Sequence, residues 1–377
     1  MKNKVSEYSI PTRFIDLVEQ QKPIRSKIDN AIKKVLDHGQ YIMGPEVTQF
    51  EESLRNYTGS KFAYTCANGT DALTISMMAL NVQKGDAVFV PSFTYVASAE
   101  TVAQLGATPF FVDVSKKTFN LDPKQLQRAI NEASKIGLRP RLIMPVELFG
   151  LPCDFDEIKM IADENNLHIL IDSAQSFGGE YKGRKVGTLG DITTTSFFPA
   201  KPLGCYGDGG AIFTQDSNLS EKINSIRLHG KGKEKYDNVR IGVNSRLDTI
   251  QAAILLEKIK IFDHEIRKRN EFAQMYSESL KEMFDIPIVP NQYKSVWAQY
   301  TLRLKNRNKI QDLLKSNNIP TVVYYPKALS QQDGYKDFPC ISSGLTNSEE
   351  LPYEVLSLPM HPYLKEEFIF QLKELLQ

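Results

Sequence analysis

The chain has 377 residues, with 46 lysines and arginines against 45 aspartates and glutamates, so its formal charge is only +1. This balance argues against a basic nucleic-acid-binding surface and against a polybasic membrane anchor, and we expect neither kind of partner. The hydrophobic share of 41% and the charged share of 24% are those of a globular protein, long enough for two or three domains.

Membrane and export signals are missing from the sequence. No apolar run approaches the ~20 residues of a spanning helix, and residues 1–16 lack the apolar core of a signal peptide. The cysteines lie far apart, without a CxxC pair or histidines at metal-binding spacing, at Cys66, Cys153, Cys205 and Cys340. We therefore expect a cytoplasmic protein without a metal site or a disulfide framework.

Between residues 60 and 215, short apolar runs alternate with helical stretches. The predicted strands are Lys61–Thr65, Ala87–Val90, Thr108–Val112, Arg141–Pro145, His168–Ile171, Ile192–Phe198 and Gly210–Thr214, and the predicted helices are Thr70–Leu80, Val96–Leu105, Asp122–Ala133 and Phe155–Asn165. This alternation predicts an α/β fold with a largely parallel sheet covered on both faces. The last two strands follow one another through a short turn, which predicts an antiparallel or mixed portion.

The pattern changes beyond residue 215. A long amphipathic helix is predicted from Arg246 to Lys260, and its pattern continues through Glu265–Lys281. The other predicted helices are Ser220–Arg227, Lys309–Ser316 and a last helix from Leu364, and the predicted strands are Trp297–Leu304 and Thr321–Tyr325. The proline-containing stretch Asp285–Tyr293 marks a further break. We expect a large domain with an N-terminal helical segment over residues 1–260 and a small C-terminal α+β domain over residues 261–377.

Ligands of open parallel sheets bind at the carboxyl ends of the strands. The first candidate there is the segment Cys66–Asp71, between a predicted strand and a predicted helix. Gly69 permits a tight turn, and the free N–H groups of a helix that starts at Thr70 suit a phosphate. Threonine and aspartate are also common as simple helix caps, so this segment alone leaves both interpretations open.

The second candidate is Asp172, which ends the predicted strand His168–Ile171. A buried carboxylate is costly unless it meets a cation or hydrogen-bond donors. A protonated ring nitrogen at ~4 Å would contribute roughly 4 kcal/mol at an effective dielectric of ~20. A helix cap, a turn residue and a magnesium ligand are the alternatives.

The third candidate is Lys201, which follows an apolar strand and precedes a glycine-rich turn. A lysine amine there can form a Schiff base with a carbonyl cofactor, and the nearby Ser196 offers a hydroxyl to a phosphate. The glycines of Gly207–Gly210 allow close packing beside the lysine but lack the fingerprint of a dinucleotide site. Phosphate cradle, aspartate and lysine are together the parts of a pyridoxal 5′-phosphate (PLP) site.

Longer motifs resemble a known family. They are Ala67–Asp71 (ANGTD), Pro91–Tyr95 (PSFTY), Asp172–Gln175 (DSAQ), Ser196–Lys201 (SFFPAK) and Asn244–Asp248 (NSRLD). On these motifs, the chain resembles the DegT/DnrJ/EryC1/StrS family of PLP-dependent sugar aminotransferases over nearly its full length. The resemblance implies the aspartate-aminotransferase-like architecture of PLP-dependent fold type I, and a homodimer with its active sites at the subunit interface.

The resemblance also implies roles for the cofactor-binding residues. Lys201 would hold PLP and act as the catalytic proton shuttle, and Asp172 would pair with the pyridinium nitrogen. Tyr95, which could otherwise be a core aromatic, would stack on the ring. Further contacts would come from Gln175 to the ring hydroxyl, from Ser196, Gly69 and Thr70 to the phosphate, and from Asn244 of the neighbouring subunit to the same phosphate.

Within the family, residues 197–210 and 240–248 are most like those of UDP-2-acetamido-2-deoxy-3-oxo-glucuronate aminotransferases, which use L-glutamate as donor. Arg246 would then bind a carboxylate bidentately. His229 would belong to a basic loop for the nucleotide phosphates, with Lys231, Lys233, Lys235 and Arg240, although such a loop also fits a solvated surface run. Tyr324 would face the sugar, where close relatives usually carry histidine. The implied context is bacterial lipopolysaccharide or O-antigen synthesis.

Three alternatives remain at this stage. The same chemistry could act on a dTDP-3-oxo-6-deoxyhexose. A PLP-dependent sugar dehydratase is a second alternative, but relatives with that activity replace the lysine at Lys201 with histidine. A non-catalytic regulatory member would be expected to have an incomplete site, whereas Lys201, Asp172 and Ser196 are all present.

Overall fold

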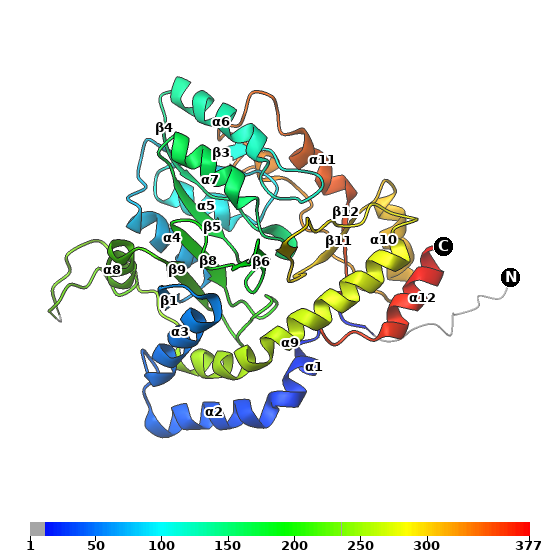
Figure 1. Ribbon diagram of the computed structural model, residues 1–377, viewed down its shortest axis with the longest axis horizontal. Coiled ribbons are helices and arrows are strands. Elements are labelled where there is room, and N and C mark those ends of the chain that lie inside the picture. Colours follow the sequence, from blue (N-terminus) through cyan, green and yellow to red (C-terminus); the bar gives the residue numbers. More distant parts are fainter. Residues whose placement is uncertain (1–11, 235) are drawn as a thin grey trace.

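A seven-stranded sheet lies at the centre of the molecule, in the order β1-β9-β8-β5-β4-β2-β3 (Figure 1). It is described from a computed structural model, which covers residues 12–234 and 236–377. The strands are β1 (Phe62–Cys66), β2 (Asp86–Pro91), β3 (Thr108–Val112), β4 (Arg139–Ile143), β5 (His168–Asp172), β8 (Ile192–Ser196) and β9 (Gly210–Thr214). Only β9 runs antiparallel to its two neighbours, so the predicted mixed, mostly parallel sheet is confirmed.

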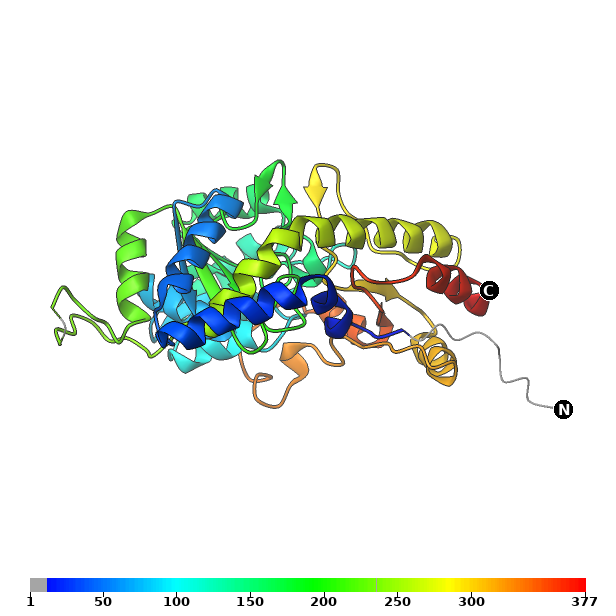
Figure 2. The same ribbon diagram turned by 90° about the horizontal axis from the view of Figure 1, so that it is seen from below.

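Helices cover both faces of this sheet (Figures 1 and 2). They include α4 (Gly69–Ala79), α5 (Ala97–Gln104), α6 (Pro123–Lys135), α7 (Phe155–Glu164) and α8 (Ser217–Ile226), all close to their predicted positions. Helix α6 illustrates why. Asp122 caps it by accepting a hydrogen bond from the Lys124 N–H at 3.1 Å, and Pro123 occupies its first turn. Its apolar positions recur at helical spacing and face the core.

The N-terminal segment is helical and lies along the long helix α9 (Thr249–Leu280) (Figures 1 and 2). It forms α1 (Leu17–Gln21), α2 (Arg25–His38) and α3 (Pro45–Thr58). Two sequence-based expectations concern residues outside the described ranges. One is the absence of a signal peptide, which concerns residues 1–16, of which 1–11 are not described. The other is Lys235 of the basic loop. In the part of the chain that is described, no helix combines the length and apolar character needed to cross a bilayer.

The C-terminal part holds a two-stranded antiparallel sheet of β11 (Tyr300–Arg303) and β12 (Val355–Leu358). Around it lie α10 (Arg307–Ser316), α11 (Thr346–Glu354) and α12 (Glu366–Leu376), and a small sheet is formed by β6 (Glu180–Tyr181), β7 (Arg184–Lys185) and β10 (Tyr293–Lys294). The predicted strand Thr321–Tyr325 is wrong. Only Val322 makes an isolated bridge, to Ser357, because the next residues turn their rings towards Phe14 and Gln175.

Helix α9 crosses the predicted domain boundary between residues 260 and 261 without a break. It begins at Thr249, three residues later than predicted, because Asp248 is extended and bridges Ile42. Phe262 packs into the core beside the large sheet, whereas Phe272, Tyr276 and Leu280 pack into the core around β11 and β12. The change of core along one helix is compatible with two domains, and the division itself stays a prediction.

Candidate active site

Asp172 and Lys201 lie together at the carboxyl ends of β5 and β8. Asp172 is buried, and its carboxylate accepts hydrogen bonds from the Ser98 hydroxyl at 3.2 Å and from the Ala174 N–H at 3.1 Å. Burial nevertheless raises the pKa of Asp172, and burial lowers the pKa of Lys201, while each group's charge favours the charged form of the other. Within the described residues, the Lys201 ammonium makes no hydrogen bond, so its amine is available to react.

A cradle for an anion lies beside this pair, where α4 meets β8. Asn68 caps α4 by accepting the Asp71 N–H at 2.7 Å. A Cβ on Gly69 would lie 2.7 Å from the Cβ of Ser196, so only glycine lets the helix start approach the strand this closely. The Ser196 hydroxyl therefore lies beside the free N–H groups at Gly69 and Thr70. Helix N-termini with such groups bind phosphates, so the residues present fit a phosphorylated cofactor.

Two aromatic rings and an amide lie near Asp172. The Gln175 carbonyl oxygen accepts the Phe149 N–H at 2.6 Å, and its amide group donates to the Tyr325 hydroxyl at 3.2 Å. Tyr95 lies 6.2 Å from Tyr325, centroid to centroid, and is 55% exposed. This exposure excludes the interpretation of Tyr95 as a core aromatic and leaves more than half of the residue accessible to a ligand.

Sequence reasoning missed Ser98 and Tyr325 as parts of this site. Ser98 lies within α5 in an unremarkable Ala-Ser-Ala context, and its contact with Asp172 spans 74 residues of sequence. Tyr325 follows Tyr324 directly, but it belongs to the run Thr321–Tyr325, whose pattern predicts a strand and gives this side chain no role in the site. The adjacent aromatic pair was the one available signal.

Tyr324 is partly buried between the N-terminal segment and Tyr325. Its ring centroid lies 6.1 Å from that of Phe14 and 5.7 Å from that of Tyr325. Burial raises the pKa of Tyr324, so its hydroxyl is a neutral donor rather than an anion at neutral pH. The aromatic rings thus connect the N-terminal segment to the residues around Gln175.

The loop between α8 and α9 reaches away from the sheet (Figures 1 and 2). His229 and Asn244 are exposed on it, and the His229 N–H donates to the Val243 carbonyl at 3.0 Å. Among the described residues, no hydrogen bond, ion pair or ring contact joins His229, Asn244 or Arg246 to Lys201 or Asp172. These three predicted residues therefore make no direct contact with the pair, although the Ser245 hydroxyl, between Asn244 and Arg246, accepts the Ala67 N–H at 3.0 Å beside the start of α4.

The other cationic side chains of that loop are also accessible to solvent, fully or in part. Lys231 and Lys233 are exposed, and Arg240 lies 3.7 Å from the exposed Glu221. Such a surface pair contributes little to stability, so Arg240 can exchange it for another anion. In the described ranges, 12–234 and 236–377, no cluster of three or more metal-binding side chains occurs.

Three comparisons bear on this geometry. The sequence profile of the DegT/DnrJ/EryC1/StrS aminotransferase family matches residues 22–377. A UDP-2-acetamido-2-deoxy-3-oxo-D-glucuronate aminotransferase from Pseudomonas aeruginosa is 49% identical over 352 residues, which cover 93% of this chain and 95% of that protein. A crystal structure of a DegT DnrJ EryC1 StrS aminotransferase from Brucella abortus has a TM-score of 0.96 at 46% identity, covering 97% of this chain and 98% of the other.

A third relative was solved with a bound cofactor. The structure of NtdA from Bacillus subtilis with bound PMP, the amine form of the cofactor, has a TM-score of 0.88 at 28% identity. The match covers 98% of this chain and 85% of that one.

Proposed function

Because the chain belongs to the DegT/DnrJ/EryC1/StrS aminotransferase family, we propose that it moves an amino group from L-glutamate to C3 of a UDP-linked 3-oxo sugar. The family is PLP-dependent and has fold type I, so the protein is a PLP-dependent sugar aminotransferase. The proposed substrate is UDP-2-acetamido-2-deoxy-3-oxo-glucuronate, which the 49% identical Pseudomonas aeruginosa relative is named for.

The observation that carries the chemistry is the buried Asp172 with the partly buried Lys201 close to it, beside the start of α4. When bound, PLP supplies an aldehyde that accepts the amino group of glutamate and a ring that stabilises the negative charge formed as protons move. Asp172 would keep a ring nitrogen protonated, since the carboxylate favours a positive charge opposite it. Gly69, Thr70 and Ser196 would bind the phosphate, and Gln175 and Tyr95 would orient the ring.

Lys201 would hold the cofactor through its amine and then move a proton between the substrate carbon and the cofactor. Burial favours the neutral amine of Lys201, which is the form that can act as nucleophile and base. Tyr325 fixes the amide of Gln175 through its hydroxyl. The two half-reactions would share these residues, so the order of events would be ping-pong.

The substrate and partner parts of the proposal concern the loop between α8 and α9. We propose that a homodimer places Asn244 of one protomer against the phosphate site of the other, with His229 and Arg246 as contacts for the nucleotide sugar. The support is the exposure of Asn244 and His229 on a loop that leaves its own sheet. We also propose a cytoplasmic location and a role in surface-polysaccharide synthesis; the four cysteines form no disulfide, which agrees with a reducing compartment.

The function is tested with two keto sugars. Purified protein should lose its visible cofactor absorbance when L-glutamate is added, and should regain it with UDP-2-acetamido-2-deoxy-3-oxo-glucuronate while forming an amino sugar. Lys201→Ala should abolish both changes. Higher kcat/KM with a dTDP-3-oxo-6-deoxyhexose would refute the substrate assignment, and a protein that takes up no PLP would refute the chemistry.

Arg246→Ala separates the acidic from a neutral sugar. If Arg246 binds the uronate carboxylate, the substitution should lower kcat/KM about tenfold or more, as loss of a charged hydrogen bond would. Unchanged kcat/KM would exclude that contact.

A further inference from the structure

Glu147 is a buried acid directly behind the residues that surround the cofactor site. It follows β4 and precedes the short 3-10 turn Leu148–Gly150, and it has no exposed surface. Its backbone N–H donates to the carbonyl of Asp172 at 3.0 Å, so the segment that follows β4 is hydrogen-bonded to the last residue of β5. The proposed chemistry gives Glu147 itself no role.

The carboxylate of Glu147 is held by hydrogen bonds rather than by a cation. It accepts the Cys153 N–H at 3.1 Å and the Ser176 hydroxyl. Among the described residues, no lysine, arginine or histidine pairs with it. Burial raises the pKa of Glu147 to about 7, and the charge of Asp172 adds to that rise. A buried carboxyl without a cation costs folding free energy, so its presence needs another explanation.

The turn that Glu147 starts also holds Gln175. The Phe149 N–H donates to the Gln175 carbonyl oxygen at 2.6 Å, and the Leu148 N–H donates to the Asn120 side chain at 2.9 Å. Ser176, which bonds the Glu147 carboxylate, is the neighbour of Gln175. Three hydrogen bonds therefore join the segment from Glu147 to Phe149 to the segment from Asp172 to Ser176.

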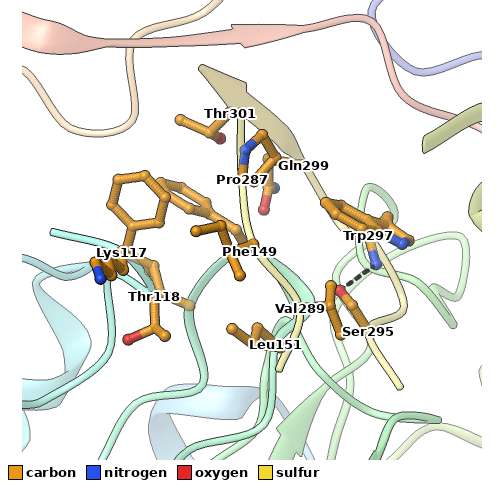
Figure 3. Close-up of a pocket in the computed structure, with 13 residues that line it drawn as sticks. Lys117, Thr118, Phe149, Leu151, Pro287, Val289, Ser295, Trp297, Gln299 and Thr301 are labelled. Atoms are coloured by element: carbon orange, nitrogen blue, oxygen red, sulfur yellow. Dashed lines mark hydrogen bonds between the residues drawn. The ribbon is translucent and has the colours of Figure 1, made fainter. Parts of the chain in front are cut away.

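Apolar packing holds the outer side of this turn, where Leu148 and Phe149 are buried in a cluster with Phe119, but it leaves one small space. Figure 3 shows a cavity there, with Phe149 and Leu151 on one side and Trp297 and Gln299 on the other. Its volume is about 20 Å³, enough for roughly one water molecule. The Gln299 carbonyl oxygen on its wall is buried and has no hydrogen-bond partner among the described residues. On the outer side, the Gly150 carbonyl accepts the Val296 N–H and the Ser295 hydroxyl, both at 3.0 Å. The hydrogen bonds around Glu147 hold the inner side, which faces Asp172 and Gln175.

We propose that Glu147 is a positioning residue: it anchors the turn that orients Asp172 and Gln175 towards the cofactor ring. The ring-facing roles of Asp172 and Gln175 rest on the proposed function. The anchoring itself is a property of the chain alone and can be measured without cofactor.

The test compares Glu147→Ala, Glu147→Gln and Ser176→Ala with a matched control, Asp86→Asn. Asp86 is equally buried and pairs with Arg139, but it lies at the opposite end of the sheet, at the start of β2. Glutamine can still accept the Cys153 N–H and donate to Ser176, so it preserves the anchor. Two readouts are used: hydrogen exchange of peptides covering residues 144–153 and 170–180 in apoprotein, and PLP affinity from quenching of intrinsic fluorescence.

We expect Glu147→Ala to lose exchange protection in both peptides and to bind PLP about tenfold more weakly, with Ser176→Ala about threefold weaker. Glu147→Gln should stay within about threefold of wild type, and Asp86→Asn should lower the melting temperature without changing PLP affinity. Wild-type protection and affinity in Glu147→Ala would overturn the proposal, as would a glutamine variant as weak as the alanine variant. If Glu147→Ala does not fold, unchanged protection in Ser176→Ala overturns it instead.

The two proposals fail in different ways. A wild-type protein that takes up no PLP would refute the proposed function, while the exchange data would still decide whether Glu147 anchors the turn.

Discussion

Replacing Gly69 with alanine tests the phosphate cradle by adding one methyl group. The new Cβ would lie 2.7 Å from the Ser196 Cβ and 3.3 Å from its Cα. Carbon atoms in contact are about 3.5–4.0 Å apart, so the methyl is about 1 Å too close. Ser196 cannot easily retreat, because it is paired with Gly210 across the sheet. Helix α4 must therefore move away from β8.

The magnitude follows from two opposing effects. Overpacking a fixed site costs about 1–3 kcal/mol, whereas alanine in place of glycine favours a helix by up to about 1 kcal/mol. We expect a net loss of about 1–2 kcal/mol in the unfolding free energy of the apoprotein. The displaced N–H groups should lower PLP affinity about tenfold or more, since each 1.4 kcal/mol is about tenfold.

Fluorescence titration of apoprotein with PLP measures the affinity, and urea unfolding measures the stability. Gly334→Ala is the matched control, because a Cβ there meets nothing within 4 Å. If Gly69→Ala binds PLP as tightly as Gly334→Ala, then the cradle does not lie between α4 and β8.

Substitutions at three further buried residues test the energetics of burying titratable groups. Burial lowers the pKa of Lys258 from 10.5 to about 8, so the free energy of unfolding should rise between pH 8 and 10.5. At pH 7, where the charged amine is buried, Lys258→Met should raise the free energy of unfolding in urea by up to about 3 kcal/mol, which is the difference between the two pKa values expressed as energy. Burial lowers the pKa of His361 from 6.5 to about 4, so stability should fall as pH drops through that interval, and His361→Gln should flatten the slope of melting temperature against pH. Asp113 accepts the N–H groups of Asn347 and Ser348 at 3.0 and 2.8 Å; Asp113→Ala should cost about 2–4 kcal/mol in urea unfolding, and Asp113→Asn less. A pH-independent effect of Lys258→Met, or no flattening in His361→Gln, would contradict the assigned pKa shifts.

Local signals predicted the large sheet well. Thr108–Val112 and Gly210–Thr214 are strands with the predicted bounds, because buried strands of a covered sheet are short apolar runs between turns. The C-terminal part was harder. Thr321–Tyr325 has the β-branched residues of a strand, but only one isolated β-bridge forms there. Its two aromatic residues contact Phe14 and Gln175 instead. Propensity cannot report such a choice, since the competing contacts come from distant sequence.

The site divides in the same way. Lys201, Asp172, Ser196 and Gly69 could be found because each stands where a strand ends or a helix begins, and parallel strands bring those ends to one edge of the sheet. Arg246, His229 and Asn244 rest on the family resemblance. Among the described residues they make no direct contact with Lys201, so their roles stay predictions.

The near-neutral composition argues against a broad basic surface, and the sequence by itself determined the fold class, the cofactor and the order of the reactive side chains. Only the tertiary structure decided which groups support them: Ser98 on Asp172, Tyr325 on Gln175, and the buried Glu147 behind both. The physical reason is distance along the chain. Strand ends and helix starts are written in neighbouring residues, whereas these hydrogen bonds join residues 29 to 150 positions apart.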